Sequence, residues 1–142
     1  MNKEFKECVM MLSSVAGQHK LLYLMDLSKK VKGLSKSDKN ENTKIFGCMS
    51  VSYVKTYINN DIVEVQIDSE SVFVKGLLYV LQLYINGQAP EDVLRINEVQ
   101  LMKDIGLRNA ITSQRTNGFY AALTKIKEDV YGNKNTLPQE EK

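Results

Sequence analysis

Apolar side chains near the start of the chain recur at the spacing of two amphipathic helices. One set runs from Phe5 to Leu12 and a second from Leu21 to Leu27, with the small and polar residues Ser14 to Gly17 between them. Intervals of three and four residues place side chains on one face of a helix. We therefore predict two helices with a break near Gly17, and Cys8, beside the first apolar stripe, as a packed structural residue.

The next segment changes to a polar and then an alternating pattern. Residues 33–43 are rich in Ser, Asn and Asp, which favour turns, so we expect a mobile connector. Two β-rich runs follow, Ser50 to Ile58 and Ile62 to Asp68, and the turn residues 59–61 separate them. This pattern is typical of a β-hairpin. A lone hairpin is marginally stable, so its apolar face should pack on helices, and a short third strand beside it is compatible with the pattern.

Residues 72–86 form a nearly all-apolar run, which predicts the central helix of the core. The segment Asp68 to Ser71 supplies oxygens that can cap its start, and Gly87 can end it. Its polar positions share one narrow stripe, so most of its surface should be buried. Gly76 costs the helix about 1 kcal/mol relative to alanine, which indicates that another backbone passes close there.

The last third of the chain predicts two short helices and one long helix. The short helices span Pro90 to Ile96 and Val99 to Ile105, and the long one starts at Thr112 or Ser113 and ends at Gly132. The fold class is therefore α+β: a small antiparallel sheet packed against a helical layer. We expect a single domain over residues 1–132 and a flexible polar tail over residues 133–142.

Composition excludes several classes of protein. The 142 residues can bury a core without staples, and 19 basic against 17 acidic side chains give a net charge of +2. A nucleic-acid-binding protein usually shows a concentrated basic surface, so we expect no nucleic acid. No apolar run is long enough for a signal peptide or a membrane span, so we expect a cytoplasmic protein that binds no membrane. Cys8 and Cys48 lack metal-ligand spacing, so we expect no bound metal and no disulfide.

Cys48 is the candidate reactive residue. It lies where the polar connector ends and the first strand begins, in the stretch Lys44 to Ser50. The thiolate is the nucleophilic form of cysteine, and solvent and nearby cations decide how much of it exists. The competing interpretation is a small apolar side chain that seals the loop against the core.

The apolar stripe of the last helix leads back to a positive charge. Stepping one turn back from Phe119 along this stripe reaches Arg115. A cation in the first turn is disfavoured by the helix dipole, and burial adds a desolvation cost, so Arg115 needs an anion. The candidates are Asp68, Glu70 and the thiolate of Cys48. Alternatively, Arg115 reaches solvent and pairs with a surface carboxylate. Gly118 again indicates close approach of another segment.

Several separated motifs resemble the SufE-type cysteine desulfuration proteins. Gly47-Cys48-Met49-Ser50 is similar to their Gly-Cys-Gln-Ser, Asp68-Ser69-Glu70 to their Asp-Ser-Asp, and Val74-Lys75-Gly76-Leu77 to their Val-Lys-Gly-Leu. Ile105-Gly106-Leu107 and the set Ser113, Arg115, Asn117 and Gly118 follow in the family's order. The resemblance covers Leu21 to Lys127. The chain departs from the pattern at Ser28, Met49, Tyr53 and Glu70, where the family usually has Gly, Gln, Trp and Asp.

The resemblance implies a SufE/IscU-like fold and a sulfur carrier that is not a stand-alone enzyme. Cys48 would accept sulfane sulfur as a persulfide from a pyridoxal-phosphate cysteine desulfurase, activate that enzyme, and pass the sulfur to an iron–sulfur scaffold. Arg115 would stabilise the thiolate. The loop and partner contacts would be Gly47, Met49, Ser50, Asp68 and Glu70. Pyridoxal phosphate would belong to the partner, so this chain would hold no permanent cofactor, and it would be a monomer or weak dimer.

Physical chemistry adds one expectation and several alternatives. A persulfide must be shielded, so we expect Cys48 against an apolar surface near Phe46, Met49 and the central helix. An iron–sulfur scaffold is one alternative, although a cluster needs several thiolates. A regulatory module without sulfur chemistry is another. A thiol peroxidase would need a resolving cysteine, and a cysteine hydrolase would need His19 to meet Cys48.

Overall fold

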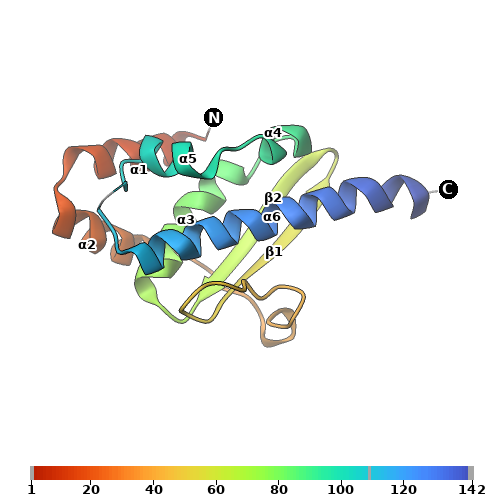
Figure 1. Ribbon diagram of the computed structural model, residues 1–142, viewed down its shortest axis with the longest axis horizontal. Helices are drawn as coiled ribbons and strands as arrows, with labels where there is room; N and C mark the ends of the chain where they lie inside the picture. The colour runs from red at the N-terminus through yellow and green to blue at the C-terminus, as the bar shows by residue number, and fades with distance from the viewer. Residues whose placement is uncertain (1, 109, 141–142) are drawn as a thin grey trace.

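The structure, a computed structural model, describes the backbone of residues 2–108 and 110–140, with side chains as far as residue 133. Its helices and hairpin form an α+β fold (Figure 1). The elements in chain order are α1 (Lys3–Ser14), α2 (Gly17–Leu27), the 3-10 turns η1 (Ser28–Lys30) and η2 (Lys36–Asp38), β1 (Ser52–Asn59), β2 (Ile62–Ser69), α3 (Val72–Ile85), α4 (Pro90–Leu94), α5 (Glu98–Asp104) and α6 (Ser113–Glu140). The predicted fold class and the order of its elements are confirmed.

β1 and β2 form an antiparallel hairpin whose register runs from Ser52 opposite Ser69 to Asn59 opposite Ile62. Asn60 and Asp61 both have positive φ, as a tight hairpin turn that follows the strand twist requires. Alternate residues of β2 point into the core, where Val63, Val65 and Ile67 are buried. In the described residues a third strand is reduced to one bridge, between Lys44 and Tyr53.

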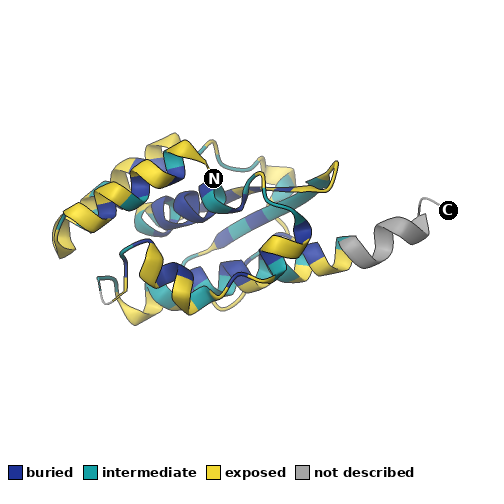
Figure 2. Ribbon diagram, turned by 90° about the horizontal axis from the view of Figure 1, so that it is seen from above, coloured by how far each residue is buried: buried dark blue, intermediate teal, exposed yellow. Residues whose placement is uncertain are grey.

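α3 is the central helix, as predicted. Most of its residues are buried, and the dark band it forms lies between α1 and α2 on one side and the hairpin on the other (Figure 2). The Ser71 hydroxyl accepts a hydrogen bond from the Val74 N–H and caps the helix. A Cβ on Gly76 would lie 1.8 Å from the Leu24 carbonyl oxygen, so glycine here is what lets α2 and α3 touch.

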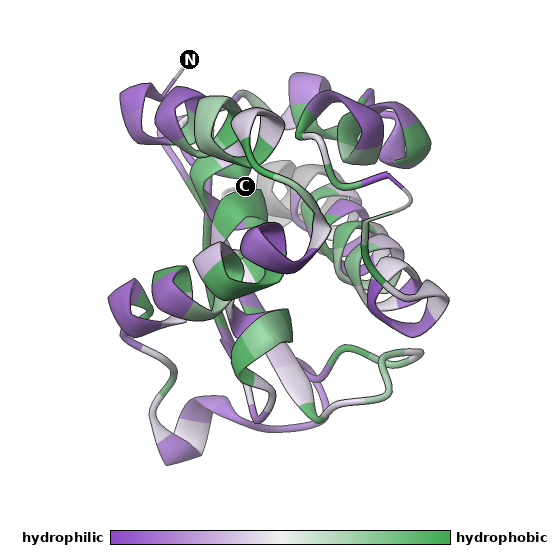
Figure 3. Ribbon diagram, turned by 90° about the vertical axis from the view of Figure 1, so that its left-hand side faces the viewer, coloured by the Kyte–Doolittle hydropathy of each residue, from purple (hydrophilic) through white to green (hydrophobic). Residues whose placement is uncertain are grey.

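α6 crosses the hairpin and packs on β1 (Figure 1). Thr56 of β1 donates a hydrogen bond to Asp129 of α6 at 2.9 Å, and the inward stripe of the helix, including Phe119, is buried. Hydrophobic segments gather toward the middle of the molecule and hydrophilic ones toward its outer helices (Figure 3). α6 continues to Glu140, so the prediction that it ends at Gly132 is wrong: the helix accommodates a glycine there. The flexibility of residues 133–142 stays a prediction.

Two features are absent from the residues that the structure describes. No helix among them is long and apolar enough to cross a membrane. Among the same residues, no three His, Cys, Asp or Glu side chains gather closely enough to hold a metal ion.

Candidate functional site

Cys48 lies in the loop that leads into β1, and its thiol is free and half-buried. It packs against the edge of the hydrophobic core and opens into a hollow of about 190 Å³. Three segments line this hollow: the loop (Cys48, Met49, Ser50), the start of α3 (Ser71, Val74) and the start of α6 (Thr112, Gln114, Arg115). The thiol is therefore sheltered on one side and reachable from solvent on the other.

The starts of two helices converge on this hollow. Ser71 caps α3, and the Thr112 hydroxyl accepts a hydrogen bond from the Arg115 N–H at the start of α6, as predicted for Thr112. The N-terminal end of a helix carries a partial positive charge from its aligned peptide dipoles. Both ends therefore favour a negative charge on a group in the hollow, such as a cysteine thiolate.

Gly118 of α6 lies directly against the thiol. A Cβ built on Gly118 would sit 3.0 Å from the Cys48 sulfur, closer than ordinary van der Waals contact. The close approach inferred from this helix glycine is therefore confirmed, and the approaching group is the thiol itself. The glycine leaves room for the sulfur beside the helix.

A chain of serine hydroxyls supports the sulfur from the hairpin side. The Ser52 hydroxyl lies 3.5 Å from the Cys48 sulfur, 3.0 Å from the Ser50 carbonyl oxygen and 2.9 Å from the Ser69 hydroxyl. Ser69 in turn accepts a hydrogen bond from the Ser71 N–H. Ser52 is completely buried and Ser69 is nearly so, which makes these hydroxyls part of the structure around the thiol.

Arg115 lines the hollow together with Cys48, and its pairing with the Cys48 thiolate stays a prediction. Its guanidinium lies over the Phe73 ring, 4.5 Å from the centroid, in a cation–π contact. Among the described side chains no carboxylate lies within 4.0 Å of it, so pairing with Asp68 or Glu70 is wrong. The ring of Phe73 offers its negative face instead, and holds the positive charge beside the hollow that Cys48 shares.

Asp68 lies away from the hollow and binds the connector. Its side chain accepts hydrogen bonds from the N–H groups of Leu34 and Ser69 and pairs with Lys39 and Lys75. Burial alone would raise the pKa of Asp68, but these N–H and ammonium groups outweigh it, so its pKa is lowered. Asp68 is only 7% exposed. The contact of Asp68 with a partner stays a prediction, and in the structure Asp68 ties the predicted mobile connector to the fold.

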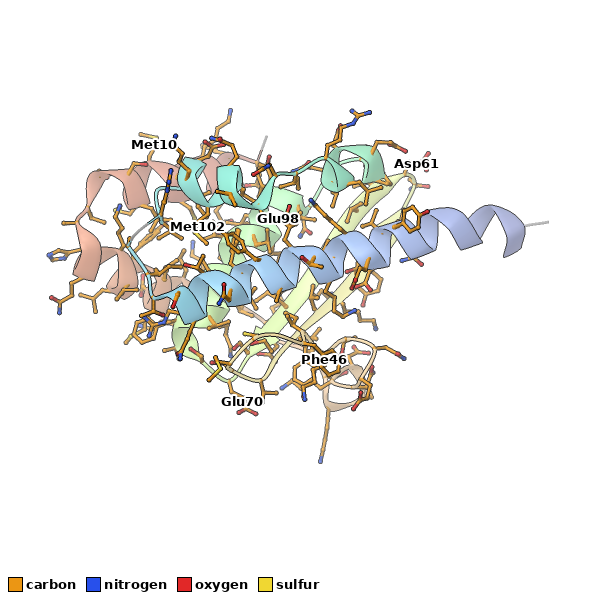
Figure 4. All side chains as sticks on the ribbon, viewed as in Figure 1. Met10, Phe46, Asp61, Glu70, Glu98 and Met102 are labelled. Carbon is orange, nitrogen blue, oxygen red and sulfur yellow. The ribbon has the colours of Figure 1, made fainter. Side chains whose placement is uncertain are left out.

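The other predicted contact residues lie on the surface around the thiol. Gly47, with φ +91°, and Met49 are exposed, Ser50 is partly buried, and Glu70 is exposed at the end of β2. Figure 4 shows Phe46 and Glu70 on the same side of α6, below the helix in that view. The four predicted contact residues lie where a partner can reach them, and their contact with a partner stays a prediction.

The expected shelter for Cys48 is partly wrong. Phe46 is 62% exposed and Met49 is 74% exposed, so most of each side chain faces solvent, although Met49 also lines the hollow. Both lie in the loop around Gly47, which has a positive φ. Val74 of the central helix does line the hollow, but Gly118 and Ser52 make the contacts with the sulfur.

Cys8 is a structural residue, as predicted. It is 1% exposed and accepts a hydrogen bond from the Tyr23 hydroxyl at 3.4 Å. Burial raises the pKa of Cys8, so its reactive thiolate form is disfavoured. His19 lies exposed on α2, outside the residues that line the hollow. These positions leave the hydrolase and peroxidase alternatives without their partner groups.

Sequence reasoning missed Ser52, Ser69 and Phe73 as parts of this site. Ser52 and Ser69 face each other across the hairpin, so the pairing register would have brought them together. Phe73 looks in the sequence like one more apolar residue of a buried helix, and nothing in its spacing marks a ring beneath an arginine.

Comparisons with known proteins agree with this description. Residues 6–130 match the family described as SufE, Fe-S metabolism associated domain. The fold resembles the solution structure of a hypothetical protein from Thermus thermophilus, with a TM-score of 0.74 and 19% sequence identity. That match covers 93% of this chain and 96% of the other. At this identity the structural likeness shows the fold alone.

Proposed function

The chain belongs to the SufE family, described as the Fe-S metabolism associated domain, which has a role in iron–sulfur metabolism, and we propose on this basis that Cys48 is a sulfur acceptor. In this proposal a pyridoxal-phosphate cysteine desulfurase supplies the sulfur, and the chain activates that enzyme by removing its product. The pyridoxal phosphate belongs to the partner, and an iron–sulfur scaffold receives the sulfur afterwards. We place the transfer in the cytoplasm, where reducing conditions keep the thiol available.

The observation that carries the proposal is the position of the Cys48 thiol. It is half-buried, it opens into a hollow of about 190 Å³, and Arg115 lines the same hollow. A water molecule occupies about 30 Å³ in the liquid, so there is room for one more sulfur atom beside Cys48. A carrier needs such a place, because a persulfide exposed on all sides would be lost to oxidants and other thiols.

The proposed transfer balances without an oxidant or a reductant. The Cys48 thiolate attacks the outer sulfur of the desulfurase persulfide, so a sulfur–sulfur bond forms on Cys48. The sulfur–sulfur bond of the donor breaks, and the electron pair leaves with the donor cysteine as its thiolate. The outer sulfur keeps its proton or charge throughout. The convergent helix starts and Arg115 favour the anionic forms of Cys48 on both sides of this step.

The two alternatives make different demands on the molecule. A scaffold needs several ligands near one another, whereas Cys8 is buried in α1 against Tyr23 and Cys48 lies against α6. A regulatory module would need the surface around Cys48 but not its sulfur. The separation of the two cysteines argues against an iron–sulfur scaffold. An experiment is needed to distinguish a regulatory module from a sulfur carrier.

The test measures alanine formation by a purified cysteine desulfurase, with pyridoxal phosphate and cysteine present. The native chain should raise the turnover rate, Cys48→Ser should not, and Cys8→Ala should act like the native chain because it removes only the buried thiol. Equal stimulation by Cys48→Ser would favour the regulatory module. Iron colour that resists a chelator after reconstitution would favour the scaffold.

A further inference from the structure

Among the described residues, Ser52 has a polar side chain in contact with the Cys48 sulfur. Its hydroxyl lies 3.5 Å from the sulfur, a distance that suits a hydrogen bond to this large atom. Ser52 is completely buried at the first position of β1, so its hydroxyl points into the structure and is fixed there by the hairpin. A buried hydroxyl in this position responds to the charge on the sulfur.

The Ser52 hydroxyl has one proton but lies near three acceptors. They are the Cys48 sulfur, the Ser50 carbonyl oxygen and the Ser69 hydroxyl. A serine hydroxyl donates one hydrogen bond and accepts two. When the sulfur is a neutral thiol, Ser52 can donate to Ser50 or Ser69 and accept from the S–H group.

When the sulfur is negative, the same hydroxyl can turn and donate to it. The Ser69 oxygen, which accepts from Ser52 in the structure, keeps the hydrogen bond that it accepts from the Ser71 N–H. The Ser50 carbonyl, which belongs to a partly buried residue, can turn to water. Each buried hydroxyl therefore keeps a partner in both charge states, and the change needs only bond rotations.

We propose that Ser52 is a catalytic hydrogen-bond donor that stabilises the anionic Cys48 sulfur during sulfur transfer, with Ser69 holding it in position. This inference deepens the proposed function and rests on it. The hydroxyl stays neutral and gives up no proton: it donates to the thiolate before attack, and again to the thiolate that Cys48 becomes when its outer sulfur is passed on. Arg115 is the one charged side chain among the described residues that line the hollow, so it adds a positive charge to the same hollow.

The test uses the intact chain and iodoacetamide, so it does not depend on a desulfurase. Ser52→Ala removes the hydroxyl and leaves the backbone of β1 in place. Its matched control is Ser28→Ala, which removes another buried hydroxyl, bonded to the Met25 carbonyl and outside the hollow. Alkylation of Cys48 is followed by peptide mass spectrometry from about pH 6 to about pH 10, the range over which a cysteine thiol titrates.

At neutral pH Ser52→Ala should react about tenfold more slowly than the native chain, because a hydrogen bond to a charged group is lost. The difference should disappear at high pH, where both sulfurs are anionic. Ser69→Ala should show a smaller shift of the pH profile in the same direction. Ser28→Ala should match the native profile even if its melting temperature falls.

The inference would be overturned if Cys48 in Ser52→Ala were alkylated at neutral pH as fast as in the native chain, or faster. It would also be overturned if Ser28→Ala slowed the alkylation as much as Ser52→Ala does. If Ser52→Ala does not fold, Ser69→Ala carries the test, and an unshifted profile in that variant counts against the inference. A shifted profile in a chain that accepts no sulfur from a desulfurase would keep the role of Ser52 and reject the carrier function. Sulfur acceptance by a chain whose variants show unshifted profiles would keep the carrier function and reject the role of Ser52.

Discussion

Gly118 lies so close to Cys48 that a side chain on the glycine would press on the sulfur: a Cβ there would be 3.0 Å from Sγ. The glycine belongs to α6, and the cysteine comes from a loop far earlier in the chain. The contact joins the two segments that form the hollow. It explains why a helix keeps a residue that weakens it by about 1 kcal/mol.

Gly118→Ala should displace the thiol without unfolding the protein. The added methyl group pushes the Cys48 sulfur outward, while alanine strengthens the helix by about 1 kcal/mol. We expect faster alkylation of Cys48 by a bulky reagent, with an unchanged or slightly raised melting temperature. Gly132→Ala, in the same helix but with nothing within 4 Å of its Cβ, should change the thiol reactivity little. Equal alkylation rates in the two variants would argue against the contact.

Arg115→Ala should slow the reaction of Cys48 near neutral pH. The guanidinium lines the same hollow and is held over Phe73, so its loss removes a positive charge near the thiolate. We expect alkylation by iodoacetamide to slow about fivefold, equivalent to about 1 kcal/mol. Arg115→Lys should recover part of the rate, because lysine keeps the charge but not the planar contact with the ring. An alanine variant with the native rate would remove Arg115 from the chemistry.

Gly76→Ala should destabilise the fold strongly. Its Cβ would lie 1.8 Å from the Leu24 carbonyl oxygen, so α2 and α3 would have to separate. Overpacking of a core costs about 1–3 kcal/mol, and we expect the upper end or more because backbone must move. Urea unfolding measures the loss. Gly17→Ala, where nothing lies within 4 Å of the Cβ, is the control, and a similar stability of the two variants would contradict the packing described.

Because of Asp68, the free energy of unfolding should fall as the pH is lowered in the acid range. Its pKa is lowered in the folded chain, so its contribution is present above the unfolded value of about 3.9 and is lost as the pH falls through the folded value. Asp68→Asn should lower the free energy of unfolding at neutral pH by about 2 kcal/mol, since Lys39 and Lys75 lose their partner. It should also flatten the dependence of stability on pH in the acid range.

The matched control is Asp38→Asn, which breaks the more exposed pair with Lys55. Thermal unfolding followed by circular dichroism at several pH values compares the two variants. A loss for Asp38→Asn as large as that for Asp68→Asn would contradict the role of Asp68 as the anchor of residues 33–39.

Much of this fold follows from local rules that operate on the sequence. Alternation in β2, the cap at Ser71 and the cost of a helix glycine at Gly76 each depend on neighbours in the chain or on a general requirement of helices. The end of α6 did not follow, because a single glycine such as Gly132 weakens a long helix without being enough to end it. Local sequence preferences therefore predict the positions of helices and strands more accurately than they predict the ends of these elements.

The site was less predictable because its contacts join distant segments. Cys48 stood out for its residue type, and Gly118 for its position in a helix. The partner of Arg115 is a ring on another helix, and Asp68 binds a connector that composition alone presents as free. Contacts of this kind depend on how elements pack, which spacing along the chain does not encode.

Intact mass spectrometry of the chain after incubation with a cysteine desulfurase, pyridoxal phosphate and cysteine shows directly whether Cys48 accepts sulfur. We predict an added mass of one sulfur atom on the native chain, removed by a reducing agent and mapped to Cys48. Cys8→Ala should gain the same mass and Cys48→Ser should not. A native chain that stays at its original mass while the desulfurase turns over, or a sulfur adduct that persists in Cys48→Ser, would contradict this prediction.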